Sequence, residues 1–169
     1  MRALSVFIAS VLLSQLLACR VNNRLNDGPV FVCVQLPDQY YLAGSRATDQ
    51  WDTAVKAWTR IYSVQGAYEE CKIFVKPAIT PSTNPDALAW AETLSGLIYM
   101  VQGKYETAVE PLLLHELGHQ FGLIEHAEGT LMAPKYDPNS YGCIDTTTLW
   151  RLSEVAEIPL ELLKTTCAP

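Results

Sequence analysis

Residues 115–126 read HELGHQFGLIEH and contain all three histidines of the chain. An α-helix places His115 and His119, four residues apart, one turn above each other on a single face. Two imidazoles in that arrangement can bind one metal ion in a tetrahedral site. Glu116 lies about 100° around the same helix, within reach of a metal-bound water without being a ligand itself. The stretch therefore predicts a helix that carries a metal site.

The flanking residues support this interpretation. The apolar run 109–114 would bury the helix against the domain, and we expect the helix to begin near Thr107 or at Glu110. Gly122 can adopt the left-handed conformation that ends a helix and turns the chain back toward the metal, where His126 then arrives. A histidine pair on an amphipathic helix can also be a plain surface or core feature, but here no histidine is left over for a structural role.

With this motif the chain resembles the metzincin clan of zinc endopeptidases, whose signature is HExxHxxGxxH followed by a methionine turn. The match covers the first two histidines, the glutamate and the glycine, and then departs by one residue. The family's third-ligand position falls on Glu125, and the histidine comes one position later at His126. The resemblance implies an imidazole as third ligand, so we expect His126, with Glu125 as the alternative.

Residues 129–136, GTLMAPKY, resemble the matrixin form of the methionine turn. The resemblance implies that Met132 forms an apolar floor beneath the metal ligands, and that Pro134 and Tyr136 form the wall of a substrate pocket. It also implies that an edge strand of the cleft, here Ala89, Trp90 and Ala91, binds extended substrate through its main chain. Ordinary core packing of the Leu-Met pair and an apolar edge without a substrate role are the alternatives.

The expected chemistry is zinc-dependent hydrolysis of peptide bonds. Zn²⁺ held by three protein ligands keeps an open position for water and polarises the scissile carbonyl, and Glu116 acts as general base and then as general acid. The expected partner is a peptide or protein substrate. Two alternatives remain open: a zinc-binding but catalytically idle domain that holds a peptide or protein, and a zinc amidase that acts on the cell wall.

The expected fold class is α+β: a small metzincin-like domain with a mixed twisted sheet, a long N-terminal helix, an active-site helix and a C-terminal helix. Apolar β-rich runs predict strands, and apolar residues at helical spacing predict helices. The expected strands are 29–37, 71–77, 88–92 and 97–101, and the expected helices outside the site are 48–64 and 146–155, the latter capped by Asp145. No repeat or second domain is visible, and we expect a monomer.

The N-terminal residues have the pattern of an export signal. Arg2 precedes a short apolar run, and residues 16–19, LLAC, resemble the lipobox of bacterial lipoproteins. We therefore expect a signal peptide at 1–18, a lipidated Cys19 with a tether over 19–28, and a zinc metallopeptidase domain at 29–169. The chain would then be anchored by lipid in the bacterial cell envelope, on the periplasmic or surface side of the outer membrane. The alternative is a secreted protein with a chance cysteine.

The remaining cysteines are even in number, which in an exported chain favours two disulfides. Three pairings are possible, and we favour Cys33 with Cys71, on two predicted strands, and Cys143 with Cys167, which would fasten the C-terminal tail. A cysteine-ligated zinc site is the rival, but the close CxxC pairs of such sites are missing. The net charge of −6 disfavours nucleic acid as a partner.

If Cys19 is acylated, Cys19→Ser should abolish incorporation of a radiolabelled fatty acid and either block processing or release the protein from membranes. Labelling of cells that express each form measures this. A lipid-free mature chain that begins after Ala18 would show that the protein is secreted.

Overall fold

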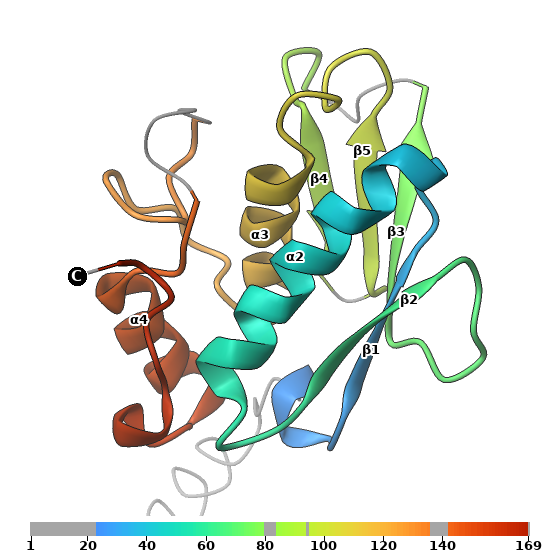
Figure 1. Cartoon of the computed structure of the whole chain (residues 1–169). Helices are drawn as coiled ribbons and strands as arrows, with labels where there is room; N and C mark the ends of the chain where they lie inside the picture. Colours follow the sequence, from blue (N-terminus) through green and yellow to red (C-terminus); the bar gives the residue numbers. More distant parts are fainter. Residues whose placement is uncertain (1–22, 80–83, 94, 136–141, 169) are drawn as a thin grey trace, which may run out of the picture.

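The computed structural model describes residues 23–79, 84–93, 95–135 and 142–168. A five-stranded sheet and three α-helices make up an α+β fold, which confirms the expected fold class (Figure 1). In chain order the elements are η1 (Arg24–Asn26), β1 (Val30–Val34), α2 (Asp38–Val55), β2 (Ile61–Gln65), β3 (Ile73–Ala78), β4 (Ala89–Glu92), β5 (Leu97–Val101), α3 (Val109–Gln120), α4 (Thr146–Ala156) and η2 (Leu160–Leu162).

The sheet is mixed, with strand order β2-β1-β3-β5-β4. The first four strands in this order pair in parallel, and β4 is antiparallel to β5 at the edge, with Trp90 opposite Tyr99. Parallel neighbours need crossover connections, and α2 supplies the one between β1 and β2. One edge of the sheet is therefore a short antiparallel strand that pairs with β5 on a single side.

The core lies between the sheet and the two helices that cross the same face of it, α2 and α3 (Figure 1). Every second residue of β1 points toward these helices, as the period of two along a strand requires. The side chains at these positions, Val30, Val32 and Val34, are fully buried. Trp51 of α2 is also fully buried, and its indole Nε1 donates to the carbonyl oxygen of Leu114 in α3 at 2.9 Å. The two helices are thus joined by a buried hydrogen bond as well as by apolar contact.

The helix expected over 48–64 is wrong in its bounds. It begins ten residues earlier, at Asp38, and it ends at Val55, because the residues that follow form β2. Ile61 is a buried strand residue in register with Val30, and the Asp52 carboxylate accepts from its N–H at 2.8 Å. The helical spacing of apolar residues happens to continue past the end of α2 into β2. β2 forms a strand because it pairs in parallel with β1, which is distant in the sequence.

The described part of the expected tether, residues 23–28, packs against the domain. Leu25 is only 1% exposed, and the Asn23 side-chain amide donates to the carbonyl oxygen of Phe121 at 2.7 Å. The folded domain therefore begins at least six residues before the expected boundary at 29. Cys19 and residues 1–18 lie outside the described residues. Among the helices that are described, none is both long and apolar enough to cross a membrane.

The C-terminal helix forms as expected. α4 begins after Asp145, whose carboxylate Oδ1 accepts from the Thr148 N–H at 2.8 Å as an N-cap. The structure pairs Cys33 with Cys71 and Cys143 with Cys167, which are the pairings favoured from the sequence. The second disulfide joins the residues before α4 to the C-terminal tail.

Trp51→Phe should lower the free energy of unfolding by about 2 kcal/mol, because it removes a buried hydrogen bond and leaves a cavity beside α3. Trp58→Phe is the matched control, since Trp58 is 40% exposed and should change stability by less than about 0.5 kcal/mol. Urea denaturation followed by circular dichroism measures both. Equal effects would show that the Trp51 contact has no special role.

Candidate metal site

The site is built on α3, which is buried on most of its surface. Leu113, Leu114 and Leu117 are fully buried, while His115 and His119 are half-buried and face a cleft. Such a helix cannot shift relative to the sheet without exposing its leucines. The core therefore fixes the two histidines in place.

The first turn of α3 has no side-chain cap, although Thr107 and Glu110 were the two starts expected from the sequence. The N-cap is Ala108, which makes no side-chain cap, and the helix begins at Val109. The Glu110 carboxylate instead accepts from Arg46 Nε at 2.6 Å and from Gln50 Nε2 at 3.1 Å. A glutamate that could have capped its own helix joins α3 to α2.

The three histidines form one group. A ligand atom from each of His115, His119 and His126 lies within 4.8 Å of the others. Their ring centroids are 4.8 Å apart for the helical pair, and 5.4 and 5.0 Å from His126 to His115 and His119 respectively. Three imidazoles that converge in this way can hold a metal ion.

Two peptide carbonyls orient the helical imidazoles. The Nδ1 atom of His115 lies 2.8 Å from the carbonyl oxygen of Leu131, and that of His119 lies 2.7 Å from the carbonyl oxygen of Leu123. Because a carbonyl oxygen only accepts, each Nδ1 carries the proton, and each Nε2 keeps a free lone pair. This is the tautomer that a metal ligand requires.

His126 reaches the group through a tight turn after α3. Gly122 has φ +93°, and its N–H donates to the carbonyl oxygen of His119 at 3.1 Å, so it ends the helix as the sequence predicts. Farther along, the Ala127 N–H donates to the carbonyl oxygen of Met132 at 2.8 Å. This bond joins the loop of His126 to the segment that also carries Leu131.

The alternative ligand, Glu125, lies outside the histidine group. Its side chain is 88% exposed, and its Oε2 pairs with Arg151 Nη2 at 3.4 Å. The extra residue between Gly122 and His126 is accommodated in the turn, where the exposed Ile124 and Glu125 lie. The structure thus brings His126, rather than Glu125, to the two helical histidines.

Glu116 is 6% exposed, and its Oε2 is buried without a hydrogen-bond partner among the described residues. Burial raises the pKa of this carboxyl group to about 8. Burial, with the neighbouring histidines as a smaller cause, also lowers the pKa of His115, and lowers that of His119 to about 4. The two helical imidazoles are therefore neutral at pH 7 and lie beside a carboxyl oxygen that has no partner among the described residues, and this set fits a metal ion.

Met132 is fully buried against α3. A Cβ placed on Gly118 would lie 2.5 Å from the Met132 sulfur, so the helix has a glycine where the thioether approaches it. The residue before it, Leu131, is the one whose carbonyl orients His115. Met132 therefore lies against α3 at Gly118, which stands between His115 and His119 in the sequence.

The histidines and Glu116 line a cleft of about 650 Å³. Ala89, Trp90 and Ala91 of the edge strand β4 line the same cleft, so these predicted substrate residues share it with the histidine group. Pro134 lines it as well, whereas Tyr136 lies outside the described residues. Sequence reasoning missed the other lining residues, which are Asn84, Asp86, Ala87, Leu88, Pro111, Leu112, Leu131, Ala133 and Lys135.

Sequence reasoning also missed the carbonyls of Leu123 and Leu131. No signal in the sequence could have found them, because any residue type supplies a main-chain carbonyl. Compared with known proteins, the chain matches no family model and no curated protein. The description of this site as a group that can bind a metal ion depends on its own geometry.

His126→Ala should weaken metal binding by at least about 100-fold, because it removes one of three ligands, whereas Glu125→Gln should change it by less than about threefold. Competition with a chromophoric chelator measures the affinity of both variants for zinc. The reverse order would identify Glu125 as the third ligand.

Proposed function

We propose that the chain is a zinc-dependent endopeptidase. The observation that carries the proposal is the buried Oε2 of Glu116, which has no partner among the described residues and lies beside three converging histidines in a cleft that the edge strand of the sheet also lines. A domain that only bound metal would have no use for a buried carboxyl oxygen without a partner among the described residues, which costs about 1–3 kcal/mol of stability. A hydrolase needs such a group next to the attacking water.

Zinc is the metal that best suits this donor set. Three imidazoles with one open position are a common catalytic zinc arrangement, although copper, iron and nickel also bind imidazole. A zinc ion held by His115, His119 and His126 would supply Lewis acidity and lower the pKa of a coordinated water to about 7. The hydrogen bonds from Nδ1 to the carbonyls of Leu131 and Leu123 keep the helical imidazoles directed at the ion.

Glu116 supplies the proton transfers. In its ionised form the Oε2 atom accepts the proton from the attacking water, and it then delivers the proton to the leaving nitrogen of the cleaved peptide bond. The apolar surroundings that bury Glu116 favour its neutral form, so a nearby cation is what would keep the carboxylate ionised. The same burial keeps bulk water away from the carboxyl group.

The edge strand supports peptide as the substrate. The Leu88 carbonyl oxygen accepts from the Val101 N–H at 2.9 Å, so Leu88 and, by the alternation of an antiparallel ladder, Trp90 direct their main chain toward β5. The N–H and C=O groups of Ala89 and Ala91 then point to the free edge. An extended peptide can add to this edge as a further strand and place a peptide bond over the histidines.

The two alternative functions, a zinc-binding domain without catalytic activity and a zinc amidase that acts on the cell wall, predict different substrate cleavage. Incubating the zinc-loaded protein with unfolded casein and, separately, with purified peptidoglycan distinguishes them. Casein cleavage supports the proposal, release of peptides from peptidoglycan alone indicates a cell-wall amidase, and inactivity on both indicates a domain that only binds. The free edge of β4 favours casein, because a strand-like substrate can pair along it.

We further propose that this peptidase works in the cell envelope. Two disulfides fit an oxidising compartment. The lipobox-like residues before Cys19 would anchor the chain to a membrane, and the folded domain would then begin only four residues after the lipid, at Asn23. A protein or peptide near that membrane is the proposed substrate.

Glu116→Gln should keep zinc binding within about threefold and lower kcat on casein by at least about 100-fold, because the residue acts on the water and does not bind the metal. Glu128→Gln, a change at an exposed glutamate in the loop after His126, is the control and should keep full activity. Fluorescent casein release with metal analysis measures both properties. Activity of Glu116→Gln within tenfold of wild type would remove Glu116 from the mechanism.

A further inference from the structure

We propose that the C-terminal tail is a positioning element of the metal site. The tail disulfide Cys143–Cys167 and Thr166 hold Asp145, Asp145 holds the main chain of Leu131, and the Leu131 carbonyl orients His115. The inference rests on the proposed metal site, but it does not depend on peptidase activity. The following contacts carry it.

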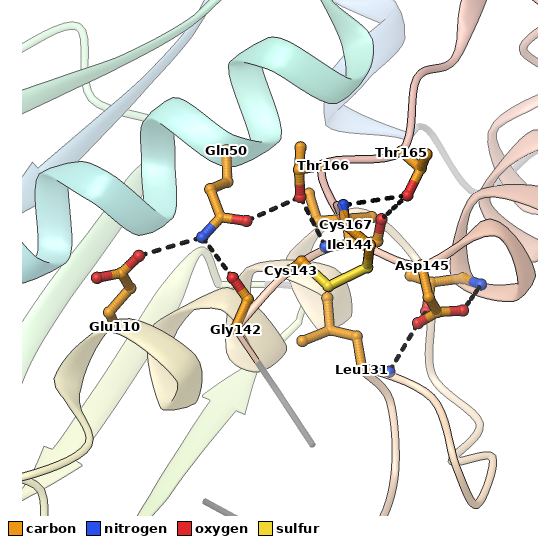
Figure 2. The surroundings of a disulfide bond; sticks show 11 residues. Gln50, Glu110, Leu131, Gly142, Cys143, Ile144, Asp145, Thr165, Thr166 and Cys167 are labelled. Carbon is orange, nitrogen blue, oxygen red and sulfur yellow. Dashed lines mark hydrogen bonds between the residues drawn. A yellow bond between two sulfur atoms is a disulfide. The ribbon is translucent and has the colours of Figure 1, made fainter. Parts of the chain in front are cut away.

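The first step fixes Ile144, the residue before Asp145. Its N–H donates to Thr166 Oγ1 at 2.8 Å, and its carbonyl oxygen accepts from the Thr166 N–H at 3.1 Å and from Thr165 Oγ1 at 2.7 Å (Figure 2). Ile144 itself is fully buried. With the disulfide between the adjacent Cys143 and Cys167, this short segment is held to the tail by three hydrogen bonds and a covalent bond.

The second step runs through the Asp145 carboxylate. One oxygen, Oδ1, caps α4 by accepting from the Thr148 N–H at 2.8 Å. The other, Oδ2, accepts from the Leu131 N–H at 2.9 Å (Figure 2). It also accepts from the Thr148 hydroxyl at 2.7 Å. Asp145 thus joins α4 to the segment that follows His126, and the bond to Leu131 is charge-assisted and correspondingly strong.

The third step is the bond from His115 to the Leu131 carbonyl oxygen, at 2.8 Å. The Leu131 N–H also donates to Asp145, so both main-chain polar groups of Leu131 form hydrogen bonds: the N–H binds Asp145 and the carbonyl oxygen binds His115. Releasing Asp145 would free the Leu131 carbonyl to move away from the imidazole. An outer-shell partner of a metal ligand changes metal affinity by about 10–100-fold when it is lost.

A second connection joins the tail to the first turn of α3, the helix that carries His115. Gln50 Oε1 accepts from the Thr166 hydroxyl at 2.8 Å, while Gln50 Nε2 donates to the Gly142 carbonyl oxygen at 2.9 Å and to Glu110 Oε1 at 3.1 Å (Figure 2). Glu110 lies in the first turn of α3. The tail is therefore linked through Gln50 to the start of the helix that carries His115, and through Ile144 and Asp145 to the loop that orients this histidine.

The other disulfide provides a matched control. Cys33–Cys71 closes a longer loop of 38 residues, against 24 for Cys143–Cys167, and neither of its cysteines lines the cleft. The Cys33 sulfur instead accepts from the Tyr68 N–H at 3.1 Å. Removing this disulfide should destabilise the fold at least as much as removing the tail disulfide, without a route to a metal ligand.

The test compares zinc affinity by chelator competition in the full-length protein at temperatures where circular dichroism shows each variant folded. Cys143→Ser with Cys167→Ser should weaken zinc binding about tenfold, whereas Cys33→Ser with Cys71→Ser should change it less than twofold. Equal losses for the two double variants, or no loss for the tail variant, would overturn the proposal. A protein without any peptidase activity would still give a clear result.

Asp145→Asn tests the intermediate step without removing the helix cap. Asparagine caps helices as well as aspartate does, but the Thr148 N–H and the Leu131 N–H bind different oxygens of Asp145, and the amide NH2 of asparagine, which only donates, would replace one of those two oxygens. We expect about tenfold weaker zinc binding for Asp145→Asn, and a change of less than twofold for Thr148→Val, which removes only the hydroxyl bond to the same carboxylate. Unchanged affinity in Asp145→Asn would show that the tail does not act on His115 through Asp145.

Discussion

The site depends on two hydrogen bonds that involve no functional side chain other than the histidines themselves. The carbonyl oxygens of Leu131 and Leu123 hold Nδ1 of His115 and His119, and thereby set the tautomer and the direction of both rings. Each carbonyl belongs to the chain that leaves α3, so the path of residues 121–132 is constrained at several points. The turn at Gly122, the bond between Ala127 and Met132, and the burial of Met132 all fix that path.

The position of α3 is a second condition, and α2 does much to supply it. Trp51 reaches the Leu114 carbonyl from the core side, and Arg46 and Gln50 bind Glu110 at the first turn. α2 therefore contacts α3, the helix that carries His115 and His119, at its middle and at its start. This is also why Gly44 lies in the middle of α2: a Cβ there would be 3.1 Å from Val34 and 3.5 Å from Leu113, so the glycine lets the three elements pack closely.

The site carries features that do not favour stability. Glu116 places a carboxyl oxygen in the interior without a partner among the described residues, and a glycine in the middle of α3 lowers helix propensity by about 1 kcal/mol relative to alanine. Apolar burial of Leu113, Leu114 and Leu117 offsets such costs. Departures from local preference that gather around one cleft are expected where a protein has a function to perform.

The sequence by itself determined the features that depend on local spacing. The interval of four between His115 and His119, the stop at Gly122, the cap at Asp145 and the strands of apolar β-rich residues each follow from a short stretch of chain. Tertiary structure decided what depends on distant partners. Residues 61–65 form a strand instead of the end of a helix because they pair with β1. Residues 23–26 join the domain because Asn23 donates a hydrogen bond to the Phe121 carbonyl oxygen and Leu25 is buried in the core. His126 joins the histidine group, while Glu125 turns to Arg151, because the folded loop sets their positions. The carbonyls that orient the histidines could not be predicted, since a main-chain group has the same chemistry at every residue and only the fold determines where it lies.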